Sequence, residues 1–295
     1  MTELAQLLFQ GVALGATYSL IALGFVVVFR ASKVVNFAQT AMLLLGAYLV
    51  SWLAVDQGIA FAPAVLLAAV LLALGGIGFQ AGVLRRVAGQ EPFVLVMITL
   101  GAGIALIALV EAVFGPEQRP IGDPWAASAV SVGGVTLLWV KVWTIGVVVA
   151  ALVAYFAFDR FSRYGLAIRA TAADEEAAGA VGVPVRRVHM ITWALAGVLA
   201  TLGGVFLAGF PNAAHPTMGD AALRAFPAVI LGGLESPIGA VVGGMVIGIV
   251  EVLAAGYAPA ELGANFHAIA PYLVMMLVLL VRPYGLFGAR PVERL

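Results

Sequence analysis

LLFQGVALGATYSLIALGFVVVF, residues 7–29, is a stretch without a single charged residue. A helix needs roughly 20 apolar residues to cross about 30 Å of hydrocarbon, so this stretch is long enough for a membrane span. The rest of the chain has the same character, because 63% of its 295 residues are hydrophobic and only 10% are charged. A soluble domain carries roughly 25% charged residues. We therefore expect an all-α polytopic membrane protein, since a helix satisfies its own backbone hydrogen bonds in lipid.

Further apolar runs of span length predict about eight long membrane helices. The predicted spans are residues 7–29, 37–55, 60–84, 93–114, 142–158, 188–210, 238–255 and 266–281. A shorter run at 225–234 is interrupted by Pro227, Gly232 and Gly233. We interpret it as a short or broken crossing, because irregular backbone is tolerated at membrane depth only when it is buried in protein or lines a cavity.

Glycine spacing predicts where helices approach one another closely. The small-residue pairs are Gly11/Gly15, Gly78/Gly82, Gly239/Gly243 and Gly244/Gly248. Packing explains these pairs without any function. Gly133 and Gly134, in the longest polar loop on the other side of the membrane from the basic loops, indicate a small hairpin.

The positions of lysine and arginine predict the orientation. They gather in the loops after the first, third and fifth predicted spans. Short cytoplasmic loops collect basic residues, so we place these loops in the cytoplasm and the N-terminus outside. The tail, with Arg282, Arg290 and Arg294, is expected in the cytoplasm too. These two positions need an odd number of crossings, which supports the broken crossing. Residues 1–295 then form a single transmembrane domain.

Composition and motifs exclude several functions. Fifteen basic and fifteen acidic residues cancel, which leaves no basic field for nucleic acid, and the absence of cysteine excludes thiol chemistry and thiolate metal sites. The only lysines, Lys33 and Lys141, do not lie in a phosphate-binding loop. His189, His215 and His267 lack metal-ligand spacing, and we interpret all three as structural. We expect no catalytic residues, no metal and no cofactor.

RATAADEEAAGAVGVP, residues 169–184, is a charged segment in an otherwise apolar chain. Thr171 and Asp174 have capping-box spacing, and the acids at 174–176 fit the first turns of a helix. The residues Ala173, Ala177, Ala180 and Val181 form an apolar stripe at helical spacing. Gly182 and Pro184 then end the helix. The segment is either a solvated connector or a docking element for a cytoplasmic partner.

Three stretches together resemble the branched-chain amino-acid permease family of ATP-binding-cassette (ABC) importers, of the LivH type. They are VVNFAQTAMLLLGAYLV (34–50), SRYGLAIRATAADEEAAGAVGVPVRRV (162–188) and LRAFPAVILGGLESPIGAVVGGMVIGIVE (223–251). The resemblance implies the ABC importer permease fold and a cytoplasmic coupling helix, within residues 159–187, that seats in a groove of an ATPase subunit. The residues expected to couple to the ATPase are Arg169, Ala173, Asp174, Glu175, Glu176, Ala177 and Gly182.

The resemblance also implies the partners and the location. We expect two ATPase subunits, a second permease (a different chain or a copy of this one), a periplasmic or other extracytoplasmic solute-binding protein, membrane lipid and no nucleic acid. The location implied is the bacterial inner membrane. The substrate implied is a branched-chain or other hydrophobic amino acid.

Polar residues within the spans are candidates for the translocation path, because such groups usually face a bundle interior or a cavity. The candidates are Thr17, Tyr18, Asn36, Gln39, Thr40, Glu235, Ser236 and Glu251. Glu251 lies well inside an apolar run, with Arg224 as a candidate partner, whereas Glu111 is near a span end. Asn36 has a simpler explanation as a helix cap.

Two alternatives remain open from sequence. The same kind of permease carries another small solute, such as urea, an amide or an aromatic acid. A different class is a stand-alone secondary transporter or channel, whose substrate site is formed by the glycine-interrupted segments. A membrane-embedded enzyme is a more remote alternative.

Overall fold

A computed structural model describes residues 2–288 except 88, 126, 127, 134, 210, 260, 262 and 264. Four residues used in the predictions, Gly134, Phe210, Arg290 and Arg294, lie outside the described residues. Within them, seven helical segments are long and apolar enough to cross a membrane. These are α1 (Thr2–Ser32), α2 (Gln39–Ser51) with the π-helix η1 (Trp52–Asp56), α3 (Phe61–Gly82) with η2 (Leu84–Val87), α4 (Pro92–Phe114), α5 (Trp139–Phe161), α8 (Val185–Leu207) and α11 (Pro237–Tyr257).

The last predicted span is a shorter helix than the others. α12 covers Phe266–Val281, only 16 residues, and contains Pro271. Of the about eight long helices predicted, seven in the described residues are long enough to span a membrane, and α12 is shorter. The all-α polytopic class is confirmed.

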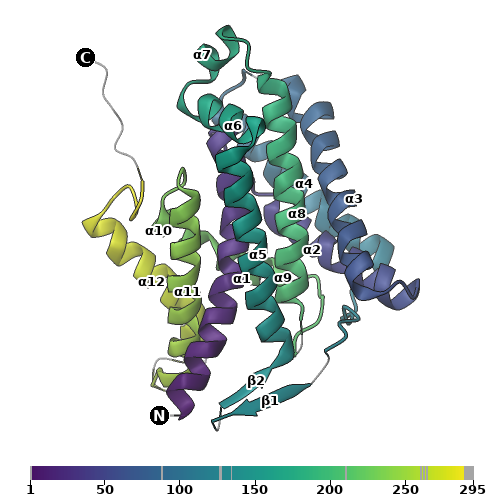
Figure 1. Cartoon of the computed structure of the whole chain (residues 1–295), viewed down its shortest axis with the longest axis vertical. Helices are drawn as coiled ribbons and strands as arrows, with labels where there is room; N and C mark the ends of the chain where they lie inside the picture. Colours follow the sequence, from purple (N-terminus) through teal and green to yellow (C-terminus); the bar gives the residue numbers. More distant parts are fainter. Residues whose placement is uncertain are drawn as a thin grey trace.

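Figure 1 shows two ends of the bundle with different contents. α6 (Arg163–Ala173) and α7 (Glu175–Ala180) lie at one end, called the α7 end. The N-terminus and the strands β1 (Ala129–Val132) and β2 (Val135–Leu138) lie at the other, called the hairpin end. The strands pair in antiparallel register, with Val132 opposite Val135. The hairpin predicted around Gly133 is therefore present.

The chain returns from the hairpin end to the α7 end through two short helices. After α8 ends at Leu207, the chain reaches Ala214, which pairs with Arg119 in a loop at the hairpin end, whereas α11 begins at the α7 end. Between them lie α9 (Met218–Leu223) and α10 (Phe226–Gly232), separated at Arg224 and Ala225. This agrees with the predicted broken crossing. The break is surrounded by α1, α11 and α12, as irregular backbone at membrane depth requires.

α1 is the central helix of the bundle, with 83% of its apolar window buried. It packs antiparallel on α11 through glycines. A Cβ on Gly248 would lie 2.2 Å from the Gly15 nitrogen, and one on Gly244 would lie 2.3 Å from the Ser19 nitrogen. This confirms the close packing predicted from small-residue spacing.

One of the predicted small-residue pairs is wrong. A Cβ added to Gly78 or Gly82 of α3 would meet nothing within 4 Å. These glycines face outward because α3 packs on α8 through its other side, where Gly76 lies against Trp193. The outer helices α4 and α5 bury only 17% and 22% of their apolar windows. Their remaining apolar surface suits contact with lipid or with another subunit.

Candidate functional site

The chain makes a tight corner between α5 and α6. The Ser162 hydroxyl caps α6 by accepting a 2.8 Å hydrogen bond from the Gly165 amide. A Cβ on Gly165 would lie 2.3 Å from the Asp159 carbonyl oxygen, so the corner requires glycine. This corner carries α6 and α7 across the end of the bundle (Figure 1).

α7 is a short helix closed at both ends by its own residues. Asp174 is the N-cap, and its carboxylate accepts a 2.9 Å hydrogen bond from the Ala177 amide. At the other end the Val183 amide bonds to the Ala178 carbonyl and the Gly182 amide to the Gly179 carbonyl, with Gly182 at φ 89°. This is a Schellman motif, and it confirms that Gly182 ends the helix.

The predicted capping box at Thr171 and Asp174 is wrong. Thr171 is buried inside α6, and the backbone becomes extended only at Asp174 (φ −160°). The N-cap is therefore Asp174 itself, three residues later than predicted. Both acids after it, Glu175 and Glu176, lie in the first turn of α7, where the helix dipole favours negative charge.

The apolar stripe of α7 faces outward. Ala177, Ala180 and Val181 are exposed, and Val181 is 81% exposed. The predicted stripe also included Ala173, which is exposed but ends α6, before the extended residue Asp174, and so does not lie on α7. The opposite side is fastened to the bundle, because Ala178 is only 5% exposed. Just beyond the helix, Val183 packs on the cluster of Ala31, Ile168 and Val188. α7 thus presents an apolar surface with an acidic first turn to the space outside the bundle.

The carboxylate of Asp159 ties this segment to α1. Its two oxygens lie 3.2 Å from the Arg30 guanidinium and 3.4 Å from that of Arg169. Arg169, predicted as an ATPase contact, thus holds α6 in place and is only partly exposed. Sequence reasoning missed Asp159, because its partners belong to α1 and α6 and nothing local links them. We call this trio the Asp159 tie.

Three polar side chains meet inside the bundle around Glu251. Tyr18 of α1 donates a 2.7 Å hydrogen bond to Glu251 Oε2, and Arg224, at the break between α9 and α10, donates a 3.0 Å bond to Oε1. Glu251 is 5% exposed, whereas the Arg224 side chain is 32% exposed. The predicted partnership of Arg224 with Glu251 is present. Tyr18 is a partner that the sequence did not indicate, although Tyr18 was itself a candidate.

The polar residues at the start of α2 occupy a helix junction. Gln39 is fully buried; it accepts a 3.3 Å bond from Asn36 and donates one of the same length to the Ala196 carbonyl of α8. The N-cap of α2 is Ala38, which makes no side-chain hydrogen bond. Asn36 supplies a capping-type contact just before the helix, since its side-chain oxygen accepts a 3.1 Å hydrogen bond from the Ala38 amide, as its simpler explanation predicted. Thr40 is nearly buried in the same turn.

The remaining path candidates have local roles. Thr17 bonds to the Ala13 carbonyl within α1. Ser236 is the N-cap of α11 and accepts from the Gly239 amide at 3.0 Å. Glu235 is half exposed and forms a 2.6 Å ion pair with Lys33 that joins the α1–α2 and α10–α11 connections. The structure thus gathers Tyr18 and Glu251 in one cluster and Asn36, Gln39 and Thr40 in another.

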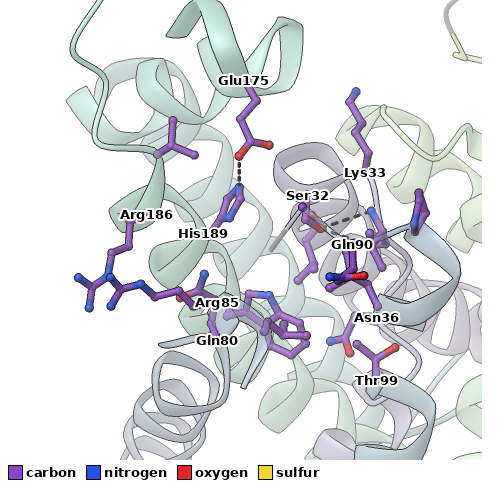
Figure 2. A pocket seen from close by; sticks show the side chains of 18 residues that line it. Ser32, Lys33, Asn36, Gln80, Arg85, Gln90, Thr99, Glu175, Arg186 and His189 are labelled. Atoms are coloured by element: carbon purple, nitrogen blue, oxygen red, sulfur yellow. Dashed lines mark hydrogen bonds and ion pairs between the residues drawn. The ribbon is translucent and has the colours of Figure 1, made fainter. Parts of the chain in front are cut away.

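A cavity of about 570 Å³ opens at the α7 end. Figure 2 shows Asn36 and Thr99 on one side of it, Arg85 and Arg186 on the other, and Glu175 facing His189 across its rim. The His189 Nε2 lies 3.2 Å from the Ala31 carbonyl and 3.7 Å from Glu175, which joins α7 to α8. Of the predicted site residues, Asn36 and Glu175 line this cavity. No group of three His, Cys, Asp or Glu side chains in the described part of the chain is placed to hold a metal ion.

Comparison with known proteins identifies the family. Residues 7–281 match the family described as "Branched-chain amino acid transport system / permease component". The chain belongs to this family. The residues that first indicated it, in the α6–α7 segment and around α10 and α11, all lie within the matched range.

Individual relatives agree with the family. The chain is 29% identical over 306 aligned positions to the "High-affinity branched-chain amino acid transport system permease protein LivH" of Escherichia coli (strain K12), covering 98% of this chain and 97% of the relative. It is 26% identical to the BraD permease protein of Pseudomonas aeruginosa, with the same coverage. Its fold is similar to that of "PsaBC from Streptococcus pneumoniae in complex with Fab", at a TM-score of 0.50 and 16% identity over 95% of this chain and 91% of the other. The chain is therefore a multi-pass membrane protein of a family of transport permeases.

Proposed function

We propose that this permease is the membrane subunit of a bacterial ABC importer that moves branched-chain or other hydrophobic amino acids into the cell. Separate ATPase subunits would drive it, and an extracytoplasmic binding protein would deliver the substrate. A second permease, either a copy or a related chain, would complete the membrane part. Family membership and the names of the relatives support the substrate class.

The observation that carries the proposal is the surface of α7. Exposed alanines, an acidic first turn and caps at both ends make a rigid helix that buries only Ala178 against its own bundle. A stripe of small residues allows another surface to approach the helix backbone closely. The chain has no phosphate-binding loop of its own. We infer that α7 seats in a groove of the ATPase and transmits its movement through Glu175, Glu176 and Ala177.

The cluster around Glu251 supports a position for the translocation path. Glu251 lies about 9 Å from the end of α11, at 1.5 Å per residue. An arginine at such depth is costly in lipid, yet nearly a third of the Arg224 side chain is exposed. We infer that the face carrying Arg224 meets water or the second permease rather than acyl chains. The path would run along this face, beside Tyr18 and Glu251.

The buried amides around Gln39 form a second part of the proposed path wall. Gln39, the first residue of α2, joins that helix to α1 and α8, since its side chain lies against Gly24 of α1 and bonds to the Ala196 carbonyl of α8. Gln39→Leu removes those polar contacts at similar volume. We expect it to insert but to reduce uptake or change which solutes pass. Normal uptake with normal selectivity would remove Gln39 from the path.

Reconstitution in liposomes tests the function directly. We expect uptake of radiolabelled leucine only when the permease is combined with its ATPase subunits, its binding protein and ATP. Uptake driven by an ion gradient through this chain alone would instead identify a secondary transporter. ATP-dependent uptake of urea, amides or aromatic acids, but not of leucine, would support the ABC importer and show that its substrate is not a hydrophobic amino acid.

A further inference from the structure

The polar lining of the cavity at the α7 end comes from the ends of membrane helices. Lys33 follows α1, Arg85 follows α3, Gln90 precedes α4 and Arg186 lies in the first turn of α8. The ends of spanning helices lie at the depth of the lipid headgroups. The cavity is therefore at the membrane–water boundary and not in bulk solution.

Two cations of this cavity have no ion-pair partner among the described residues. Lys33 pairs with Glu235, and Glu175 faces His189, but in this part of the chain no side-chain hydrogen bond or ion pair joins Arg85 or Arg186 to another residue. Figure 2 shows both arginines on the same side of the cavity, although they come from different elements. Two neighbouring guanidinium groups repel each other, and a bound anion removes that repulsion.

A buried acceptor next to the arginines also lacks a partner. Gln80 is 5% exposed and lines the cavity, and its side-chain oxygen has no hydrogen-bond donor within the described residues. Buried acceptors are nearly always bonded. This oxygen adds an unpaired acceptor to the polar side of the cavity that carries Arg85.

An apolar groove of about 170 Å³ continues from the cavity towards the membrane centre. Trp193 lines both, and the ring of Phe79 packs against it at 5.2 Å between ring centroids. The groove lies between α2, α3 and α4 and reaches Leu106, about 20 Å along α4 at 1.5 Å per residue. Leu71, which is 47% exposed, borders it on the lipid side.

We propose that this cavity and groove together bind one anionic phospholipid of the leaflet at the α7 end. The phosphate lies between Arg85 and Arg186, and one acyl chain occupies the groove. An amino acid or free phosphate would leave the groove empty, whereas a phospholipid uses both parts. Basic pockets between membrane helices are suited to anionic headgroups. This site does not depend on which solute the permease carries.

The headgroup is tested with a matched pair of double variants. Arg85→Gln/Arg186→Gln removes the cavity cations, whereas Arg86→Gln/Arg187→Gln removes their sequence neighbours, which do not line the cavity. The full-length protein, purified with the subunits that accompany it, is titrated with phosphatidylglycerol or phosphatidylcholine, and bound lipid is counted by native mass spectrometry. We expect the first variant to bind phosphatidylglycerol with about tenfold lower affinity. The second variant should bind it as the unmodified protein does. Equal binding of the two lipids by the unmodified protein, or equal loss in both variants, overturns the proposal.

The groove is tested separately, with a change that does not disturb the protein. A Cβ at Gly75, which lines the groove, meets nothing within 4 Å, and the same is true of Gly78, one turn away and outside the groove. Gly75→Leu should fill the groove and displace phosphatidylglycerol, whereas Gly78→Leu should not. Retention by Gly75→Leu overturns the proposal, as does displacement of the lipid by millimolar inorganic phosphate.

Discussion

Tyr18 and Glu251 are joined by a 2.7 Å hydrogen bond across the interface of α1 and α11, although they are 233 residues apart in sequence. The same carboxylate also binds Arg224. A buried polar group is costly unless it is hydrogen-bonded. Both oxygens of Glu251 have a donor, so its hydrogen bonds depend on Tyr18 and Arg224 together.

Glu251→Ala should therefore affect folding as well as transport. The substitution leaves Arg224 and the Tyr18 hydroxyl without an acceptor, which we expect to lower the free energy of unfolding by about 1–3 kcal/mol. The unfolding midpoint in detergent and leucine uptake should both fall. Glu251→Ala/Arg224→Ala should recover part of the stability, because no unpaired charge remains. Glu111→Ala, at an exposed acid of α4, is the control; an equal fall there would contradict this role.

Gly248→Ala should weaken the central helix pair. Its Cβ would lie 2.2 Å from the Gly15 nitrogen, and backbone that close cannot move aside without separating α1 from α11. Overpacking of this kind costs about 1–3 kcal/mol, measurable as a lower unfolding midpoint. Gly78→Ala meets nothing and should gain up to about 1 kcal/mol from helix propensity. An unchanged unfolding midpoint for Gly248→Ala would show that α1 and α11 are not in close backbone contact at this position.

Ala177→Trp should block coupling to the ATPase while the protein folds normally. Ala177 is exposed on α7, so the indole is accommodated in the isolated permease but not in a closely fitting groove. ATPase activity stimulated by loaded binding protein should fall about tenfold, equivalent to about 1.4 kcal/mol, and less ATPase should co-purify. Full transport by this variant would make the segment a connector only.

The charge of α7 should matter independently of its shape. Glu176→Arg reverses one of the acidic charges at the start of α7 and should weaken ATPase binding most at low salt, where charges are least screened. Glu91→Arg is the matched control, because Glu91 is an exposed acid at the same end of the bundle that is not part of α7. Equal effects of the two variants would indicate a general charge effect rather than docking.

Cysteine labelling tests the predicted orientation. The chain has no cysteine, so single cysteines can be introduced at the exposed positions Gln57, Gln118, Arg86 and Glu175. A membrane-impermeant thiol reagent on intact cells should label positions 57 and 118 and spare 86 and 175. Labelling of position 175 from outside would reverse the orientation and remove α7 from the cytoplasm.

Span positions were predictable because they depend on local composition. The bounds of α12 coincide with the predicted run at 266–281, and α10 lies within the predicted short run at 225–234, with Pro227 in its first turn and Gly233 just after its end. The end of α7 was also predictable from local sequence, since Gly182 adopts the left-handed backbone conformation that the Schellman motif requires. The beginning of α7 could not be predicted in this way, because both Thr171 and Asp174 are residues that can cap a helix. Ile168 and Thr171 pack into the bundle and keep α6 helical through Thr171, so the new helix begins only after Asp174.

The contacts that build the candidate sites depend on several elements at once. Gln80, Arg85 and Arg186 come from α3, η2 and α8, and no sequence pattern brings them together. Glu251 was identifiable as an acid in an apolar run, but its bond to Tyr18 requires the crossing of α1 and α11. For Gly78 and Gly82, spacing alone could not tell an outward face from a packed one.

The Asp159 tie has a mechanical consequence. Arg30 and Arg169 bind the same carboxylate, so α6 cannot shift far without moving the end of α1 that lies at the α7 end. α1 is in turn locked to α11 by glycine contacts that leave no room to slide. A displacement of α7 should therefore move α1, α6 and α11 together as one rigid body. Spin labels on α1 and α11 should then keep a constant separation throughout the transport cycle.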